Sequence, residues 1–236
     1  MRMKRLALLL LTLTVAAFAA DPAPVTHDYL AAGAIDYRTL VTPPPTDSSI
    51  AGQADLETAR LFDAQRTPEQ AALAKHYEKL TLFVILTDVL GTECTAENLP
   101  HTVEIFKHVW VESRPIVDEA KARWNRPRPY ITNPALHPAV EKPDNASYPS
   151  GHAYSSSLIA VLLSVALPEH AADWQRQADL VRWSRLVGGA HYPNDVVAGK
   201  ILGEAVAREL LKSPKLQHDL EEVRAEIRGR LLKKAA

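Results

Sequence analysis

Residues Ser157 to Leu167 form a stretch that is apolar all round. A helix of this kind must be enclosed by protein, and it is too short to cross a membrane, which needs about 20 apolar residues. Ser150 is typical of a helix start and Pro168 of a helix end. Elsewhere the chain shows helical spacing and no alternating strand pattern of useful length. We therefore predict an all-α fold, a single-domain helical bundle around this segment.

Caps and helix breakers set the other predicted boundaries. Thr67-Pro68-Glu69-Gln70 combines an N-cap, a proline at the first helical position and a capping-box partner, and Gly91 stops that helix. A later helix can break near Arg114-Pro115. Residues 126–149 are predicted to be loop, because Arg126-Pro127-Arg128-Pro129 disfavours helix. The predicted helices span residues 48–64, 67–90, 96–123, 150–167, 169–187, 193–211 and 213–232.

The first 20 residues have the pattern of a secretory signal peptide. Met1–Arg5 is positively charged, Leu6–Ala17 is almost purely apolar, and Ala17-Phe18-Ala19 is typical of a cleavage site. The alternative, a membrane anchor, needs a longer apolar run. We predict cleavage after residue 19 or 20, a periplasmic location, and no membrane span in the mature chain.

The mature chain divides into a short arm and one domain. Residues 21–47 are rich in proline and predict an extended arm across the surface of the domain that residues 48–236 form. A net charge of −1 gives no bulk attraction to nucleic acid or to an anionic membrane. Cys94 is the single cysteine, so no disulfide can form within the chain. It is either a buried apolar filler or an exposed thiol.

Two segments place cations and small residues where predicted helices end or begin. Lys121 and Arg128 flank a proline-rigidified turn that can direct both charges at one point. In Ser150-Gly151-His152, the serine caps a helix whose first N–H groups favour an anion. His152 beside that anion could donate a proton. Each segment alone also fits an ordinary basic helix end or an ordinary capped helix.

A third segment joins Arg185 to His191 and Asp195. The spacing lets Asp195, in the first turn of a helix, accept the Nδ1 proton of His191. Nε2 would then hold a free lone pair and could act as a nucleophile. A structural histidine is the alternative for this segment alone. Together the three segments supply cations, helix amides and two histidines, a set suited to metal-free phosphoryl transfer. The four tryptophans, Trp110 among them, are interpreted as packing residues.

The order of these segments resembles a family signature. Lys121-x6-Arg128-Pro129, Pro149-Ser150-Gly151-His152 and Ser184-Arg185-x5-His191-x3-Asp195 are similar to the three motifs of the type 2 phosphatidic acid phosphatase (PAP2) superfamily. Within it, the signal peptide, the size and the context around Pro149 resemble bacterial class A non-specific acid phosphatases. The resemblance implies the helical fold that this superfamily shares with the haloperoxidases.

The resemblance also implies roles for the site residues. His191 would be the nucleophile that forms a phosphohistidine, His152 the general acid, and Asp195 the group that orients His191. The phosphoryl oxygens would be held by Lys121, Arg128, Ser150, Gly151 and Arg185. No metal or other cofactor is implied. Small phosphomonoesters would be the substrates, phosphate or vanadate would inhibit, and the chain would form a homo-oligomer.

Departures from the family pattern leave the subclass and the substrate range open. Ala146 stands where class A enzymes usually have glycine, Ala153 where they have threonine, and the cysteine pair that many of them carry is absent. Three other functions remain as alternatives. They are a vanadium-dependent haloperoxidase, a lipid-phosphate phosphatase acting at a membrane, and a non-catalytic phosphate-binding protein.

Overall fold

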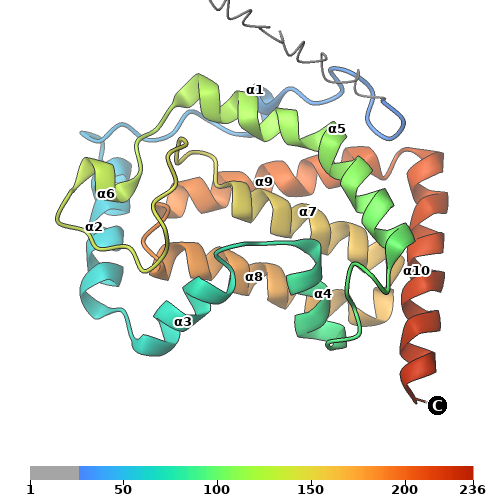
Figure 1. Cartoon of the computed structure of the whole chain (residues 1–236). Helices are drawn as coiled ribbons and strands as arrows, with labels where there is room; N and C mark the ends of the chain where they lie inside the picture. The colour runs from blue at the N-terminus through green and yellow to red at the C-terminus, as the bar shows by residue number, and fades with distance from the viewer. Residues whose placement is uncertain (1–26, 236) are drawn as a thin grey trace, which may run out of the picture.

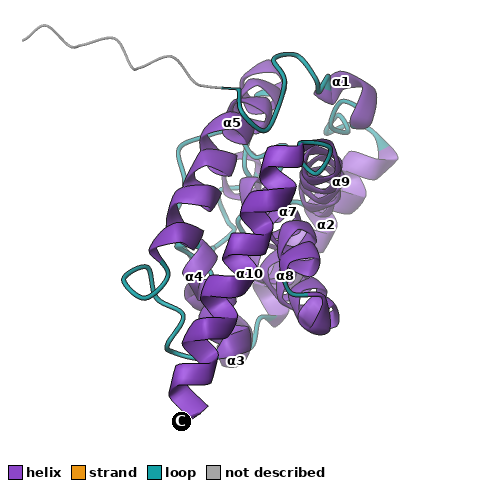
Figure 2. Ribbon diagram, turned by 90° about the vertical axis from the view of Figure 1, so that its right-hand side faces the viewer, coloured by secondary structure: helices purple, strands orange, loops and turns teal. Residues whose placement is uncertain are grey.

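The computed structural model describes residues 27–235, and all of its regular structure is helical (Figures 1 and 2). The predicted signal peptide, residues 1–20, lies outside the described residues. Since no strand occurs within residues 27–235, the predicted all-α fold is confirmed. The elements are α1 (Tyr37–Leu40), α2 (Ile50–Gln65), α3 (Pro68–His76), α4 (Leu82–Leu90), α5 (Pro100–Trp124), α6 (Pro129–Thr132), α7 (Gly151–Ala166), a 3-10 turn (Pro168–His170), α8 (Ala171–Val187), α9 (Pro193–Leu210) and α10 (Pro214–Ala235).

Helix α7 lies at the centre of the molecule, as its apolar sequence predicts. It packs mainly against α8 and α9, and α10 passes its C-terminal end (Figure 1). There the side chain of Arg224 donates a hydrogen bond of 2.6 Å to the carbonyl of Ala166. Tyr154, Leu158 and Leu162 on α7 are buried in the main core. Because α7 is enclosed by its neighbours, its N-terminus has a fixed position, and the candidate site forms there.

The prediction of one helix over residues 67–90 is wrong, because α3 and α4 are separate. The chain leaves the helix at Tyr77, whose hydroxyl donates to Asp88 at 2.9 Å and accepts from Gln177 at 2.6 Å. Thr81 then caps α4 by accepting from the N–H of Val84. A second N-cap inside an apolar run is a local signal that competes with helix continuation. The break places a short loop against α7.

The region around the prolines also differs from the prediction. Helix α5 continues through Pro115 without a break. Residues 126–149 are irregular except for α6, in which Pro129 occupies the first helical position. A proline there costs no hydrogen bond, because first-turn N–H groups have no partner within a helix. The proline-rich sequence therefore excludes a long helix and still permits one turn.

The N-terminal segment from residue 27 to residue 47 lies against α5 and α9 and contains the single turn α1 (Figure 1). Its start is held by the buried carboxylate of Glu112, which accepts from the backbone N–H groups of Asp28, Tyr29 and Leu30. Cys94 is fully buried in the main core, as its interpretation as an apolar filler requires.

Two glycines allow α9 to lie directly against the first turns of α7. A Cβ added at Gly199 would lie 2.4 Å from the carbonyl oxygen of Ser150, and one at Gly203 would lie 2.2 Å from that of Tyr154. Both obstacles are backbone atoms, which cannot move without moving the helix. The close approach brings the start of α9 beside the start of α7, where the predicted catalytic segments lie.

Replacing Gly203 with alanine is expected to lower the free energy of unfolding by about 2 kcal/mol, because the helices must separate to admit the methyl group. Gly229 in α10 provides the matched control, since a Cβ there meets nothing within 4 Å. Gly229→Ala should instead stabilise the protein by about 0.5–1 kcal/mol, because alanine favours helix. Chemical denaturation of both variants measures the difference. Equal effects of the two substitutions would contradict the close-packing argument.

Candidate active site

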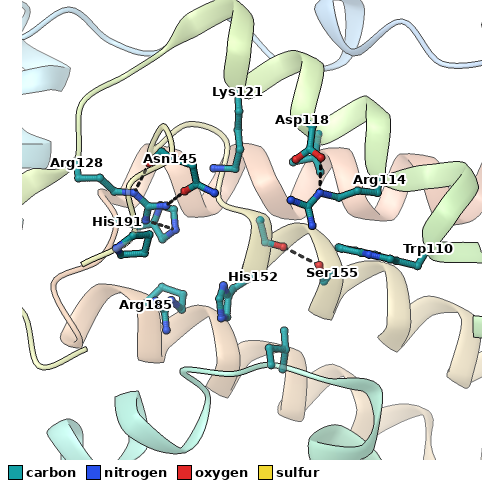
Figure 3. Close-up of a pocket in the computed structure, with 14 residues that line it drawn as sticks. Trp110, Arg114, Asp118, Lys121, Arg128, Asn145, His152, Ser155, Arg185 and His191 are labelled. Carbon is teal, nitrogen blue, oxygen red and sulfur yellow. Dashed lines mark hydrogen bonds and ion pairs between the residues drawn. The ribbon is translucent and has the colours of Figure 1, made fainter. Parts of the chain in front are cut away.

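A cavity of about 240 Å³ opens beside the N-terminus of α7. Its walls come from segments that are far apart in sequence: α5 and the loop that follows it, the start of α7, the end of α8 and the turn before α9 (Figure 3). The structure thus brings most of the predicted site residues to one place. Those that line the cavity are Lys121, Arg128, Gly151, His152, Arg185 and His191.

Local backbone signals turn these segments toward the cavity. Asn125 ends α5 in the left-handed conformation, at φ 41°, and the chain then enters the loop that carries Arg128. Gly189 has φ 73°, and an added Cβ would lie 3.2 Å from Pro138, so this turn requires glycine. The turn presents His191 directly before Tyr192, which is the N-cap of α9.

His191 is 3% exposed, and each of its ring nitrogens has a polar neighbour. Nε2 lies 3.0 Å from Nη1 of Arg128, and Nδ1 lies 3.4 Å from Oδ2 of Asp195. An arginine side chain only donates hydrogen bonds, so Nε2 must carry the lone pair and Nδ1 the proton of the neutral ring. This is the tautomer that a nucleophilic Nε2 requires.

Asp195 is fully buried behind His191 and is held from several sides. Its Oδ2 accepts from Oγ of Ser147 at 2.5 Å and from the N–H of Tyr192 at 3.0 Å, and its Oδ1 accepts from Nη1 of Arg126 at 2.7 Å. Burial raises the pKa of Asp195, and the Arg126 guanidinium opposes that rise. The 3.4 Å separation from His191 is long for a hydrogen bond, and contacts of this kind commonly tighten when substrate binds.

The sequence interpretation missed the support behind this carboxylate. Arg126 also donates from Nη2 to Asp55 of α2 at 2.8 Å, and its guanidinium lies 4.0 Å from the ring centroid of Tyr192. The other oxygen of Asp55 accepts from the N–H and the side-chain amide of Asn194. Helix α2 is therefore tied to the start of α9 through a buried ion-pair chain. A lone aspartate in a predicted helix gave no signal of this role.

Three cations, which we call the cationic cluster, surround His191: Lys121, Arg128 and Arg185 (Figure 3). Lys121 donates to the carbonyl of Ala146 at 2.6 Å, and Arg128 donates to Asn145 Oδ1 at 2.5 Å. Arg185 differs from both. It is 2% exposed, and its Nε and Nη1 have no hydrogen-bond partner among the described residues. Unpaired buried donors are costly, so a buried guanidinium with unpaired N–H groups indicates that the cavity binds an anion.

The pKa shifts in the cavity have two shared causes: burial away from water is the larger, and the positive charge of the neighbouring cations adds to it. Burial and the charge of Arg128 lower the pKa of His191 well below its ordinary value. Burial and Arg185 lower the pKa of His152 to about 3. Burial and Arg128 lower the pKa of Lys121 to about 7, and burial lowers that of Arg185 to about 10. A bound anion would raise all of these pKa values.

We expect an oxyanion to bind this cavity together with protons. Sulfate is the suitable ligand, because it does not titrate near neutral pH. Its affinity should fall as the pH rises above about 7, by up to about tenfold per pH unit. The reason is that Lys121 loses its proton in this range when the cavity holds no sulfate, but keeps it when sulfate is bound. Calorimetric titrations at about pH 6 to 9 measure this slope.

The variant Lys121→Met supplies the comparison for that experiment. It should bind sulfate more weakly and with little change of affinity between about pH 7 and 9, since its side chain does not titrate. A sulfate affinity of the wild-type protein that stays constant over this range would contradict the inferred coupling.

Folding also lowers the pKa of His152, so the free energy of unfolding of the anion-free protein should decrease as the pH drops below the ordinary histidine value of 6.5.

Two further predicted site residues, Ser150 and Gly151, lie at the N-terminus of α7. Ser150 is fully buried, caps α7 by accepting from the N–H of Ala153, and donates its own N–H to the carbonyl of Asp195 at 2.9 Å. It does not line the cavity, so its predicted contact with phosphate stays a prediction. Gly151 does line it, and an added Cβ would lie 3.7 Å from the side chain of Lys121. Glycine there keeps the space between the two open.

The far end of the cavity is formed by side chains to which the sequence gave no role in a site. We call this set the outer wall: Leu80, Trp110, Arg114, Val117 and Asp118. Figure 3 shows Trp110, Arg114 and Asp118 on the side of the cavity away from His191. The interpretation of Trp110 as a packing residue is therefore incomplete, because its side chain lines the cavity and is 36% exposed. Its helical spacing to Arg114 and Lys121 on α5 could have indicated a shared face.

Within residues 27–235, no group of three or more histidine, cysteine or acidic side chains is arranged to hold a metal ion. In the same part of the chain, no helix combines the length and the hydropathy that a bilayer crossing requires.

Comparison with known proteins gives matches over most of the chain. A family model described as the PAP2 superfamily matches residues 101–218, a range that contains every predicted site residue. An acid phosphatase of Zymomonas mobilis is 29% identical over 201 residues, covering 81% of this chain and 75% of that protein. A non-specific acid phosphatase of Salmonella typhimurium is 28% identical over 201 residues, covering 82% and 80%.

Among solved structures, a bacterial vanadium-dependent iodoperoxidase matches with a TM-score of 0.58 and 17% identity. The match covers 73% of this chain and 52% of that one, so this chain spans about half the length of the iodoperoxidase. At this identity the likeness concerns the fold alone. It confirms the predicted helical bundle of the haloperoxidase type.

Proposed function

This chain belongs to the PAP2 superfamily, and from that membership we propose that it is an exported acid phosphatase that hydrolyses phosphate monoesters through a phosphohistidine on His191. The relatives named acid phosphatases, which align over about four fifths of the chain, support a phosphatase. Export rests on the signal-peptide pattern of residues 1–20 and implies a periplasmic location.

The observation that carries the proposal is the unpaired guanidinium of Arg185 facing the same cavity as Nε2 of His191. A phosphoryl group bound there would accept hydrogen bonds from the unpaired N–H groups of Arg185, and the other members of the cationic cluster would offset its negative charge. Arginine suits this task, because its planar fork can donate to two oxygens at once. The fixed positive charge would stabilise the equatorial oxygens in the transition state.

In the proposed first step, Nε2 of His191 attacks phosphorus in line with the ester oxygen. The new N–P bond forms as the P–O bond to the alcohol breaks, and His152 gives its proton to the departing oxygen. Asp195 accepts from Nδ1–H of His191 and stabilises the positive charge that develops on the ring. In the second step His152, now neutral, takes a proton from water. The water oxygen attacks phosphorus, which releases phosphate and restores His191.

His152 must gain its proton when substrate binds, because a pKa of about 3 leaves its ring neutral when no substrate is bound. The carbonyl of Glu78 lies 3.2 Å from Nε2 of His152 and can only accept, so Nε2 carries a proton and Nδ1 is the nitrogen that titrates. The negative charge of the phosphoryl group would raise this pKa. Protonated His152 and neutral His191 are then favoured together at mildly acidic pH.

Hydrolysis of p-nitrophenyl phosphate by the purified mature chain tests the proposal. We expect a bell-shaped pH profile with an acidic optimum, inhibition by phosphate or vanadate, and full activity in the presence of EDTA. Loss of activity on chelation that zinc or magnesium restores would contradict the metal-free mechanism.

Two further experiments test the alternative function and the location. Halide oxidation with vanadate and peroxide, without phosphatase activity, would favour the haloperoxidase alternative. Recovery of the activity outside the periplasmic fraction of expressing cells would contradict export.

A further inference from the structure

The outer wall has no role in the phosphoryl transfer proposed above, yet it forms one continuous cavity with the cationic cluster. His152, the proposed donor to the leaving group, lies between the two in Figure 3. An alcohol that leaves phosphorus past His152 therefore enters the space in front of the outer wall. The chemistry of this wall decides which alcohols are favoured.

The wall is apolar and aromatic, with one internally paired charge. Leu80 and Val117 contribute aliphatic surface, and Trp110 contributes an indole ring that is 36% exposed. Arg114 donates from Nε to Asp118 at 2.5 Å, and its guanidinium carbon lies 5.1 Å from the centroid of the Trp110 ring. The guanidinium thus lies over one face of the indole, and because Trp110 lines the cavity and is 36% exposed, part of the ring remains open to a ligand.

The paired charges exclude one substrate class. A second phosphate on the substrate would need an unpaired cation, but Arg114 is neutralised by Asp118 within the wall. The net positive charge of the cavity is concentrated in the cationic cluster at its other end. The outer wall therefore suits an uncharged group with a flat apolar face, because exposed indole offers stacking and apolar contact.

We propose that the outer wall is a leaving-group subsite in which Trp110 stacks on an aromatic ring of the substrate. The favoured substrates are phosphate monoesters whose alcohol carries such a ring, either the base of a nucleoside monophosphate or an aryl group. This inference rests on the proposed function and goes beyond it, since the phosphoryl-transfer residues alone would accept any monoester.

Two substrates that differ only in the ring give the sharpest test. Adenosine 5′-monophosphate and ribose 5-phosphate release the same kind of primary alcohol, so their intrinsic reactivities are matched. We expect kcat/KM to be about tenfold or more higher for the nucleotide, in line with the usual strength of base–aromatic stacking. Equal kcat/KM values in the wild-type protein would overturn the proposal for bases.

Variants of Trp110 connect this preference to one side chain. Trp110→Ala should bring the ratio of the two kcat/KM values close to 1 and leave hydrolysis of ribose 5-phosphate nearly unchanged, and Trp110→Phe should restore much of the preference. The control is Trp183→Ala, because Trp183 is 39% exposed on α8, packs edge-on against Phe62, and lies outside the cavity. Equal losses for both substrates in Trp110→Ala would show a merely structural role and overturn the proposal.

A binding experiment separates failure of the subsite from failure of the phosphatase assignment. Phenylphosphonate and methylphosphonate cannot be hydrolysed at the P–C bond, and they differ by the ring. Phenylphosphonate should bind about tenfold more tightly, and the difference should disappear in Trp110→Ala. This result without any turnover would refute the phosphatase and retain the subsite. If the preference for a ring is seen with phenylphosphonate but not with the nucleotide, the subsite favours aryl phosphates. If it is seen with both, the subsite accepts aryl groups and nucleoside bases. Equal binding of the two phosphonates together with equal kcat/KM would refute the subsite.

Discussion

Replacing His191 with alanine is expected to abolish the hydrolysis of phosphomonoesters while sulfate and phosphate still bind. The side chain supplies the proposed nucleophile. Among the residues that the structure describes, the one other histidine lining the cavity is His152, which the proposed mechanism uses as the proton donor. Loss of a nucleophile that works as part of a unit costs about 10⁴-fold or more in kcat. The anion contacts come from the cationic cluster, which the substitution leaves in place.

Rapid quenching and binding measurements separate these two effects. The wild-type protein should yield an acid-labile phosphoenzyme after a short reaction with substrate, and His191→Ala should yield none. The control is His218→Ala, because this histidine is exposed on α10 and does not line the cavity. Turnover of His191→Ala within tenfold of the wild type would remove His191 from the mechanism.

The fold was largely predictable because its signals are local. The apolar run within α7, the capping box at Thr67 and the glycines after α8 each act over one or two helical turns. The errors have the same local character. Thr81 caps a second helix within a run that was predicted to continue, and Pro129 starts a turn where prolines predicted only loop. In both cases one residue type permits two structures, and tertiary contacts such as that of Tyr77 with Asp88 decide between them.

The candidate site was predictable only where residue type and spacing themselves express the chemistry. The spacing of His191 and Asp195 and the cap at Ser150 are features of this kind. The support behind them depends on contacts between distant segments, such as Asp55 of α2 with Arg126 of the loop after α5, which lie 71 residues apart in sequence. Gly203 likewise has meaning only beside Tyr154. No local pattern reveals such pairs, because either partner alone is an ordinary residue.

Replacing His152 with alanine is expected to reduce turnover by an amount that depends on the leaving group. An alkoxide leaves poorly without a proton, so hydrolysis of ribose 5-phosphate should fall by about 10²- to 10⁴-fold in kcat/KM, the usual contribution of a general acid. p-Nitrophenolate leaves readily as an anion, so p-nitrophenyl phosphate should lose far less in formation of the phosphoenzyme. Because His152 also activates water in the second step, the phosphoenzyme of this variant should accumulate when p-nitrophenyl phosphate is the substrate. A burst of p-nitrophenol followed by slow turnover would display both roles in one trace. Equal losses for the two substrates, without a burst, would mean that His152 shapes the cavity and transfers no proton.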